Sequence, residues 1–188
     1  MRTAEALELL RRYVPPRVVA HCIAVAELVE ELAERIPGVD AELAVAGALL
    51  HDIGRSVTHT PAHGYEGARL LRSLGVDERI ARIAERHVGA GITADEAPEL
   101  GLPPKDFLPE TREEKLVAYA DNLIMGTRRV SFEQSLSRFR SELGDGHPSL
   151  RRFRALHEEV LSWLNSQEDL EGVVHPHGKP EHQQEHPD

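Results

Sequence analysis

Cysteine and long apolar runs are scarce in this sequence of 188 residues. Its single cysteine, Cys22, cannot form a disulfide within the chain. No apolar run approaches the roughly 20 residues that a helix needs to cross a bilayer. Residues 1–14 mix acidic and basic side chains and lack the apolar centre of a signal peptide. We therefore expect a cytoplasmic protein that makes no contact with a membrane.

Aromatic residues and strand patterns are also rare. Aromatic side chains make up only 4% of the chain, and no segment shows the alternation of Val, Ile, Thr and Tyr that is typical of a sheet. Leu, Ala, Arg and Glu dominate instead. The sequence therefore predicts an all-α fold with little or no strand, in the single domain that a chain of this length normally forms.

Positive charge is in deficit. The formal net charge is −10, and only three of the 22 basic residues are lysines. This balance argues against a broad nucleic-acid-binding surface, but it leaves room for an arginine cluster around one small anion. A small phosphorylated ligand is compatible with the composition, whereas the oligomeric state cannot be deduced from it.

Apolar residues recur at helical spacing along most of the chain, and Pro or Gly ends most of these patterns. They predict a bundle of about seven helices. One lies between Pro15-Pro16 and Pro37-Gly38, and the next, from Ala41 to about Asp52, is apolar on nearly all sides and should cross the centre of the domain. Further helices are predicted for residues 63–74, 77–87, 111–124, 131–143 and 148–164.

Two segments lack a helical pattern. Residues 89–106 are rich in Gly and Pro, so we expect a long loop with at most one short helix, at about residues 95–100, that could close over a site. Residues 166–188 are rich in His, Pro, Gln and Glu and have little apolar material to bury, which predicts a disordered tail. Its histidines would bind metal only weakly, because a flexible tract lacks fixed ligand geometry.

The pair His51-Asp52 ends the apolar run 44–50 and is followed by Ile53-Gly54-Arg55. Chance alone would supply a His-Asp dipeptide about 0.5 times in a chain of this composition, so the pair gains meaning only from its context. Ionisable side chains at the end of a buried helix are costly unless something compensates them. A metal cation is the natural candidate.

Two distant residues complete a possible ligand set. His21 lies beside the apolar stripe of the helix that follows Pro16, and Asp121 lies in the segment Tyr-Ala-Asp-Asn at 119–122. Imidazole and carboxylate ligands suit Mn, Fe, Co, Ni or Zn better than Ca, and the absence of Cys ligands argues against a structural zinc cage. We therefore expect a divalent transition metal, whose identity the sequence does not specify.

This order of residues resembles the HD superfamily of metal-dependent phosphohydrolases, in which a His, a His-Asp pair and a distant Asp hold the metal. His21, His51-Asp52 and Asp121 match that pattern, and residues 51–54 match the HDIG form. The resemblance covers roughly residues 15–125, the core of an expected HD domain over residues 1–165. It is greatest to small stand-alone HDIG proteins of archaeal type, a group without one settled substrate.

Two more histidines, His63 and His87, resemble the additional histidines of binuclear HD proteins. The resemblance implies that Asp52 bridges two metal ions and that His63 and His87 hold the second ion. Either histidine could instead contact a substrate phosphate beside one metal ion or cap a helix end, so the number of ions, one or two, stays open. His59 is interpreted as an ordinary loop residue, although it is close enough to His63 to face the site.

The resemblance implies hydrolysis of a nucleotide or other small phosphorylated compound by a metal-activated water. Asp52 and Arg55 are the expected catalytic residues. Arg55 directly follows the HDIG segment, where its guanidinium could also bind substrate phosphate. Lys115, in the helix that carries Asp121, is a further candidate for substrate binding.

Two alternative functions remain open at this point. Some binuclear HD proteins are iron oxygenases, and the same six ligands could hold a di-iron centre. The site could also bind a nucleotide without turnover in a regulatory module, with an RNA-associated role because HD domains are found fused to RNA-modifying enzymes. A complete ligand set with an open position for water favours the hydrolase.

Overall fold

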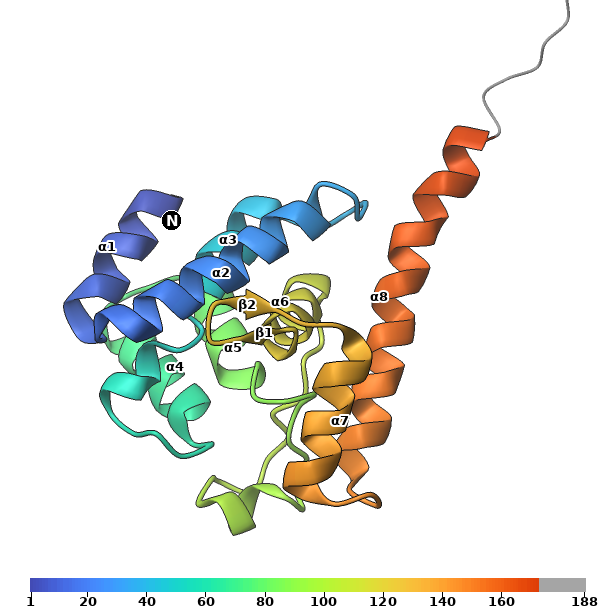
Figure 1. Cartoon of the computed structure of the whole chain (residues 1–188). Helices are drawn as coiled ribbons and strands as arrows, with labels where there is room; N and C mark the ends of the chain where they lie inside the picture. The colour runs from blue at the N-terminus through green and yellow to red at the C-terminus, as the bar shows by residue number, and fades with distance from the viewer. Residues whose placement is uncertain (173–188) are drawn as a thin grey trace, which may run out of the picture.

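The computed structural model describes residues 1–172, which form eight α-helices, two 3₁₀ turns and one small hairpin (Figure 1). The helices are α1 Thr3–Tyr13, α2 Pro16–Ala33, α3 Ala41–Leu50, α4 His63–Ser73, α5 Glu78–Arg86, α6 Arg112–Asn122, α7 Phe132–Leu143 and α8 Pro148–Gly172. The turns are η1 Ile53–Ser56 and η2 Ala97–Leu100. Strands β1 Ile124–Met125 and β2 Arg128–Arg129 pair antiparallel. Within this part of the chain, no helix has both the length and the apolar character of a membrane span.

The prediction of an all-α fold is confirmed, and most helix ends lie within two residues of their expected positions. The C-terminus differs: α8 extends to Gly172, so residues 166–172, which were expected to be disordered, are helical. The rest of the predicted disordered tail, residues 173–188, lies outside the described residues. Figure 1 shows α8 along one side of the molecule, with its last turns extending beyond the other helices.

Helix α3 lies at the centre of the core, as its continuous apolar sequence predicts. Asp40 caps its first turn by accepting a hydrogen bond from the backbone N of Leu43 at 3.0 Å. Every residue from Ala44 to Leu50 is buried, and α1, α2, α5 and α6 all pack against this helix. Its last turn therefore delivers His51 and Asp52 into the interior.

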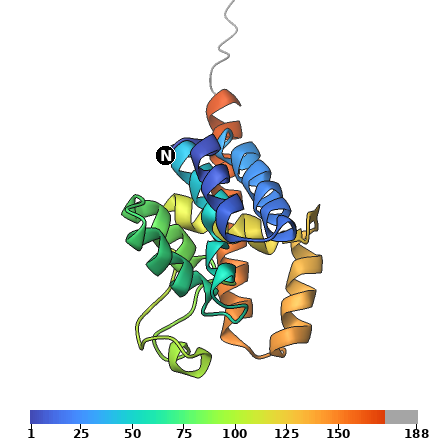
Figure 2. The ribbon, with the colours of Figure 1, turned by 90° about the vertical axis from the view of Figure 1, so that its left-hand side faces the viewer.

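The segment between α5 and α6 packs around a small apolar cluster of its own. Figure 2 shows it with α7 below the central helices. Ile92 and Phe107 pair across this segment and share a small apolar cluster with Ala97 and Leu102. Lys105 pairs with Glu85 of α5 at 3.0 Å, and Arg152 of α8 pairs with Glu96 at 2.7 Å. These ion pairs attach the predicted long loop to helices on both sides.

Gly54 is required where η1 crosses α4. A Cβ atom on Gly54 would overlap the carbonyl oxygen of His63 and would lie 2.5 Å from the backbone N of Gly67. Backbone atoms cannot yield by changing rotamer. We expect Gly54→Ala to destabilise the fold by about 3 kcal/mol, the upper part of the overpacking range, and to lower the melting temperature by about 6–12 °C. Thermal unfolding followed by circular dichroism measures this shift.

Gly146→Ala is the matched control, because a Cβ atom there meets no other atom within 4 Å and the φ angle is not positive. It should change the melting temperature by no more than a degree or two. Equal effects of the two substitutions would contradict the steric explanation for Gly54.

Candidate metal centre

Six ionisable side chains from five helices or helix ends converge at the centre of the fold. His21 lies in α2, His51 and Asp52 follow α3, His63 begins α4, His87 follows α5, and Asp121 lies in α6. His51, Asp52, His63 and His87 are buried, whereas His21 and Asp121 are partly accessible. All six are residues that the sequence singled out as candidate ligands, although their segments are spread over a hundred positions.

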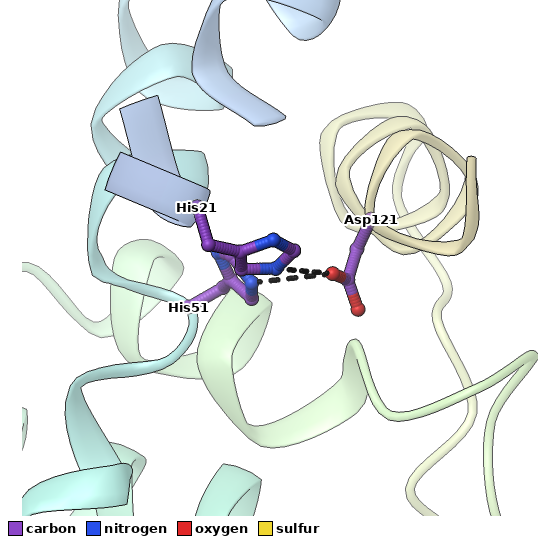
Figure 3. A group of neighbouring side chains, drawn as sticks. All are labelled: His21, His51 and Asp121. Atoms are coloured by element: carbon purple, nitrogen blue, oxygen red, sulfur yellow. Dashed lines mark hydrogen bonds and ion pairs between the residues drawn. The ribbon is translucent and has the colours of Figure 1, made fainter. Parts of the chain in front are cut away.

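The six side chains form two groups. In the first, Asp121 Oδ1 lies 3.0 Å from His21 Nε2 and 3.5 Å from His51 Nε2, and Figure 3 shows these three side chains pointing toward one another. In the second, Asp52 Oδ1 lies 3.0 Å from His63 Nε2 and 3.5 Å from His87 Nε2.

Asp52 lies between the two groups. Its other oxygen, Oδ2, faces the first group, at 4.0 Å from His21 Nε2 and 3.9 Å from His51 Nε2. Each oxygen of this one carboxylate therefore faces a different set of imidazole nitrogens. A carboxylate in this position can be shared between two cations.

Each of the four histidines is oriented by a backbone carbonyl group. His51, His63 and His87 place Nδ1 at 2.6, 2.8 and 2.7 Å from the carbonyl oxygen three residues earlier in the chain. His21 places Nδ1 at 2.7 Å from the carbonyl oxygen of Gly126 in the hairpin. Because a carbonyl oxygen can only accept, Nδ1 carries the proton and Nε2 presents a lone pair to the cluster. Metal-ligating histidines are commonly held by this kind of hydrogen bond.

The Nε2 atoms and carboxylate oxygens that face the centre of the cluster have too few protons to form hydrogen bonds with one another. His63 Nε2 and His87 Nε2 are 3.0 Å apart, so two lone pairs oppose each other when both protons are on Nδ1. His51 Nε2 and Asp52 Oδ1 are buried without a hydrogen-bond donor. A cation between these atoms would remove both deficits, and the donor set of imidazole nitrogen and carboxylate oxygen suits a divalent transition metal. The residues present therefore fit a metal ion.

The pKa shifts of Asp121 and His87 agree with this fit. Burial opposes ionisation of Asp121, but the neighbouring imidazoles of His21 and His51 outweigh it and hold the pKa of Asp121 well below its usual range. Burial lowers the pKa of His87, which favours the neutral imidazole. Burial opposes protonation of His51, but Cys22 and the carboxylates of Asp52 and Asp121 outweigh it and raise the pKa of His51, so a metal ion there would displace a proton. Ionised carboxylates and neutral imidazoles are the forms that bind metal ions.

A hollow of about 360 Å³ opens onto the cluster and is lined by two arginines, Arg17 and Arg55. His59 and Gly126 also line it. The Nε of Arg55 donates to Asp52 Oδ2 at 2.6 Å, while about a third of the Arg55 side chain stays accessible. Sequence reasoning missed Arg17, although its position four residues before His21 places both on one face of α2.

Two other residues differ from their expected surroundings. Lys115 is not brought to the cluster, because its Nζ pairs with Glu159 of α8 at 2.7 Å. The buried thiol of Cys22 has its sulfur within 4.8 Å of ligand atoms of both His51 and Asp52. A sulfur atom is therefore near the cluster, although the sequence showed no cysteine with metal-ligand spacing.

Known proteins share both the sequence and the fold of this chain. An uncharacterised protein of Methanocaldococcus jannaschii is 53% identical over 168 residues, which are 87% of this chain and 99% of that protein. The tRNA (cytidine(56)-2′-O)-methyltransferase of Picrophilus torridus is 44% identical over 145 residues, 77% of this chain. The chain spans only 42% of the length of that methyltransferase.

Among solved structures, the HD domain of the phosphodiesterase PgpH from L. monocytogenes, in complex with cyclic-di-AMP, aligns with a TM-score of 0.52 and 16% identity. The alignment covers 94% of this chain and all of that domain, which shows a shared fold. The family model of the HD domain matches residues 18–126, more than half of the chain. The protein therefore belongs to the HD domain family.

Proposed function

We propose that this protein is a metal-dependent phosphohydrolase that acts on a nucleotide or another small phosphorylated compound. The observation that carries the proposal is the position of Asp52, whose two oxygens face two sets of imidazole nitrogens beside a hollow lined by arginines. Two cation positions next to an anion-binding surface suit phosphoryl transfer to water.

The proposed ligands of the first ion are His21, His51, Asp52 and Asp121. The second ion is assigned to His63, His87 and the shared Asp52. The nitrogen and oxygen donors favour Mn, Fe, Co, Ni or Zn. A divalent cation held there would supply hydroxide from water near neutral pH.

Arg55 has two proposed roles. Its Nε holds Asp52 Oδ2 at 2.6 Å and so fixes the carboxylate between the two groups. Its remaining guanidinium nitrogens are on the side of the hollow, where they can bind phosphate oxygens. Arg17 lines the same hollow, makes no hydrogen bond or ion pair with the side chains that the structure describes, and offers a second guanidinium to the same phosphate. Lys115 has no role in this proposal because Glu159 holds its ammonium group.

The comparisons support the chemical class. The PgpH domain, which has the same fold, is a phosphodiesterase domain that binds cyclic-di-AMP, a nucleotide with phosphodiester bonds. We extend from that protein only the class of compound, because 16% identity gives no information on the substrate of this chain.

A second candidate is an RNA-associated role. It is favoured by the 44% identity to part of a tRNA methyltransferase. In that case the site would act on, or bind, a phosphate in RNA. The net charge of −10 argues against a broad RNA-binding surface on this chain alone, so a partner protein or domain would supply most of the affinity.

The proposal is tested with protein purified without a His tag, by elemental analysis together with a hydrolysis panel. The panel contains nucleoside mono-, di- and triphosphates, cyclic nucleotides and short RNAs, each with Mn, Co, Ni or Mg. We expect about two metal ions per chain and release of phosphate or a nucleotide from at least one compound. Tight nucleotide binding without turnover under every metal would contradict the hydrolase. Two irons with oxygen consumption and no hydrolysis would do so as well.

A further inference from the structure

The loop between η1 and α4 carries His59, which lines the hollow beside the metal centre together with Arg17 and Arg55. His59 is exposed, and its imidazole makes no hydrogen bond or ion pair with the residues that the structure describes. The sequence indicates only an ordinary loop residue here, whereas the structure adds a place in the hollow. None of the roles assigned so far uses this side chain.

The backbone on both sides of His59 is held in place. The backbone N of Thr58 donates to the carbonyl oxygen of Gly54 at 3.0 Å, and the hydroxyl group of Thr58 accepts from the backbone N of Thr60 at 3.2 Å. The carbonyl oxygen of Thr60 accepts from Nδ1 of His63 at 2.8 Å. The loop that orients this proposed metal ligand therefore also fixes the position from which His59 reaches the hollow.

Hydrolysis of a phosphate ester of an alcohol needs a proton for the oxygen that leaves. When hydroxide attacks phosphorus, the bond between phosphorus and the ester oxygen breaks, and its electron pair stays on that oxygen. An alkoxide is a poor leaving group, so a side chain that protonates it in the transition state accelerates the reaction by about 10²–10⁴-fold. A site for such esters is therefore expected to hold a proton donor beside the phosphate.

Of the described residues that line this hollow, His59 is the one suited to donate that proton. Arg17 and Arg55 can bind phosphate oxygens, but a guanidinium keeps its proton in proteins. His21 is held by the hairpin through Nδ1 and faces the cluster through Nε2, and Asp52 accepts from Arg55 at 2.6 Å. An imidazole without partners, by contrast, can release and regain a proton near neutral pH.

The size of the hollow brings a bound ester close to all of these groups. Its volume of about 360 Å³ is near the lower end of the range of small-molecule sites. A phosphate ester whose phosphate lies at the arginines would fill most of this space and so meet the wall that His59 forms.

We propose that His59 is the general acid of this site and protonates the ester oxygen that leaves the substrate. The inference rests on the proposed function, whose substrates it narrows to phosphate esters of alcohols, because a phosphoanhydride releases a stable phosphate anion that gains little from an acid. As the bond to phosphorus breaks, the electron pair on the ester oxygen takes the imidazolium proton and the alcohol leaves. The neutral imidazole then regains a proton from water, to which the exposed side chain has access.

Two esters that differ by one CH₂ group test this role. The alkoxide of 4-nitrobenzyl phosphate needs a proton to leave, whereas the phenolate of 4-nitrophenyl phosphate is stable without one. With the full chain and Mn, we expect His59→Gln to slow hydrolysis of the 4-nitrobenzyl ester by about 100-fold or more and that of the 4-nitrophenyl ester by less than about 3-fold. His147→Gln is the matched control, because His147 is outside this hollow, and it should leave both rates unchanged.

The outcomes separate this inference from the proposed function. Equal slowing of both esters by His59→Gln, or loss of metal from this variant in elemental analysis, would overturn the inference, because His59 would then support the fold or bind an ion. Unchanged hydrolysis of the 4-nitrobenzyl ester would overturn it as well. Turnover of phosphoanhydrides but of neither ester would overturn the general acid and leave the hydrolase standing. Hydrolysis of no compound at all would contradict the proposed function itself.

Discussion

Asp52→Asn is expected to abolish phosphate release and to remove metal from the protein. The substitution keeps the size of the side chain but replaces one anionic oxygen by an amide group, which is a poor ligand for a transition metal. Because the two oxygens of Asp52 face both histidine groups, one substitution affects both proposed ions. Mutation of a residue that only hydrogen-bonds to a metal ligand typically lowers metal affinity or activity by about 10–100-fold. Loss of Asp52, a ligand shared by both proposed ions, should therefore lower them by at least about 100-fold.

Phosphate release and metal content of the same preparation measure this effect together. Asp145→Asn is the matched control, because the Asp145 side chain is 86% exposed and pairs only with Arg140. Circular dichroism shows whether the Asp52 variant is folded. If it does not fold, Asp121→Asn tests the first group alone. A folded Asp52→Asn protein that retained both its metal and its turnover would refute the proposed mechanism.

Removal of metal is expected to lower the melting temperature by about 10 °C. Without a cation, His63 Nε2 and His87 Nε2 oppose their lone pairs at 3.0 Å, and buried acceptors on His51 and Asp52 lack donors. A ligand at a thousand times its dissociation constant stabilises the native state by about 4 kcal/mol, and each kcal/mol shifts the melting temperature of a chain of this size by about 2–4 °C. Differential scanning fluorimetry with chelator and then with added Mn or Co measures the shift.

The variant His63→Gln/His87→Gln should lose a large part of this metal-dependent shift. His157→Gln is the control: His157 hydrogen-bonds Tyr119 and stacks on Phe132, and it makes no hydrogen bond or ion pair with any of the six proposed ligands among the described residues. It can alter the melting temperature itself but should leave the shift caused by metal intact. A shift of the same size in all three proteins would mean that the added ion binds elsewhere.

The sequence was informative about the cluster because each ligand has a local cause. Asp40 and the apolar run of α3 place His51 and Asp52 in the core, and capping signals fix the starts of α6 and α7. The order of His and Asp residues then indicated which helix ends converge. The positions of these helices depend on residues that are near one another in the chain, whereas the convergence of their ends was implied by the resemblance to the HD superfamily.

Other features depend on distant contacts and could not be predicted. The pairing of Lys115 with Glu159 joins α6 to α8, and the contact of His21 with Gly126 joins α2 to the hairpin. The long loop was predicted correctly, but its attachment through Arg152 depends on side-chain geometry 56 positions away.

The directions of the helices around the cluster have an electrostatic consequence. Helices α3, α5 and α6 end at Leu50, Arg86 and Asn122, next to ligands, whereas only α4 begins there, at His63. The C-terminal end of a helix carries roughly half a negative elementary charge from its free carbonyl groups. Three negative C-terminal ends outweigh the one positive N-terminal end of α4, so the backbone itself attracts cations. Substitutions of single ligands would therefore leave a residual negative potential at the centre of the fold.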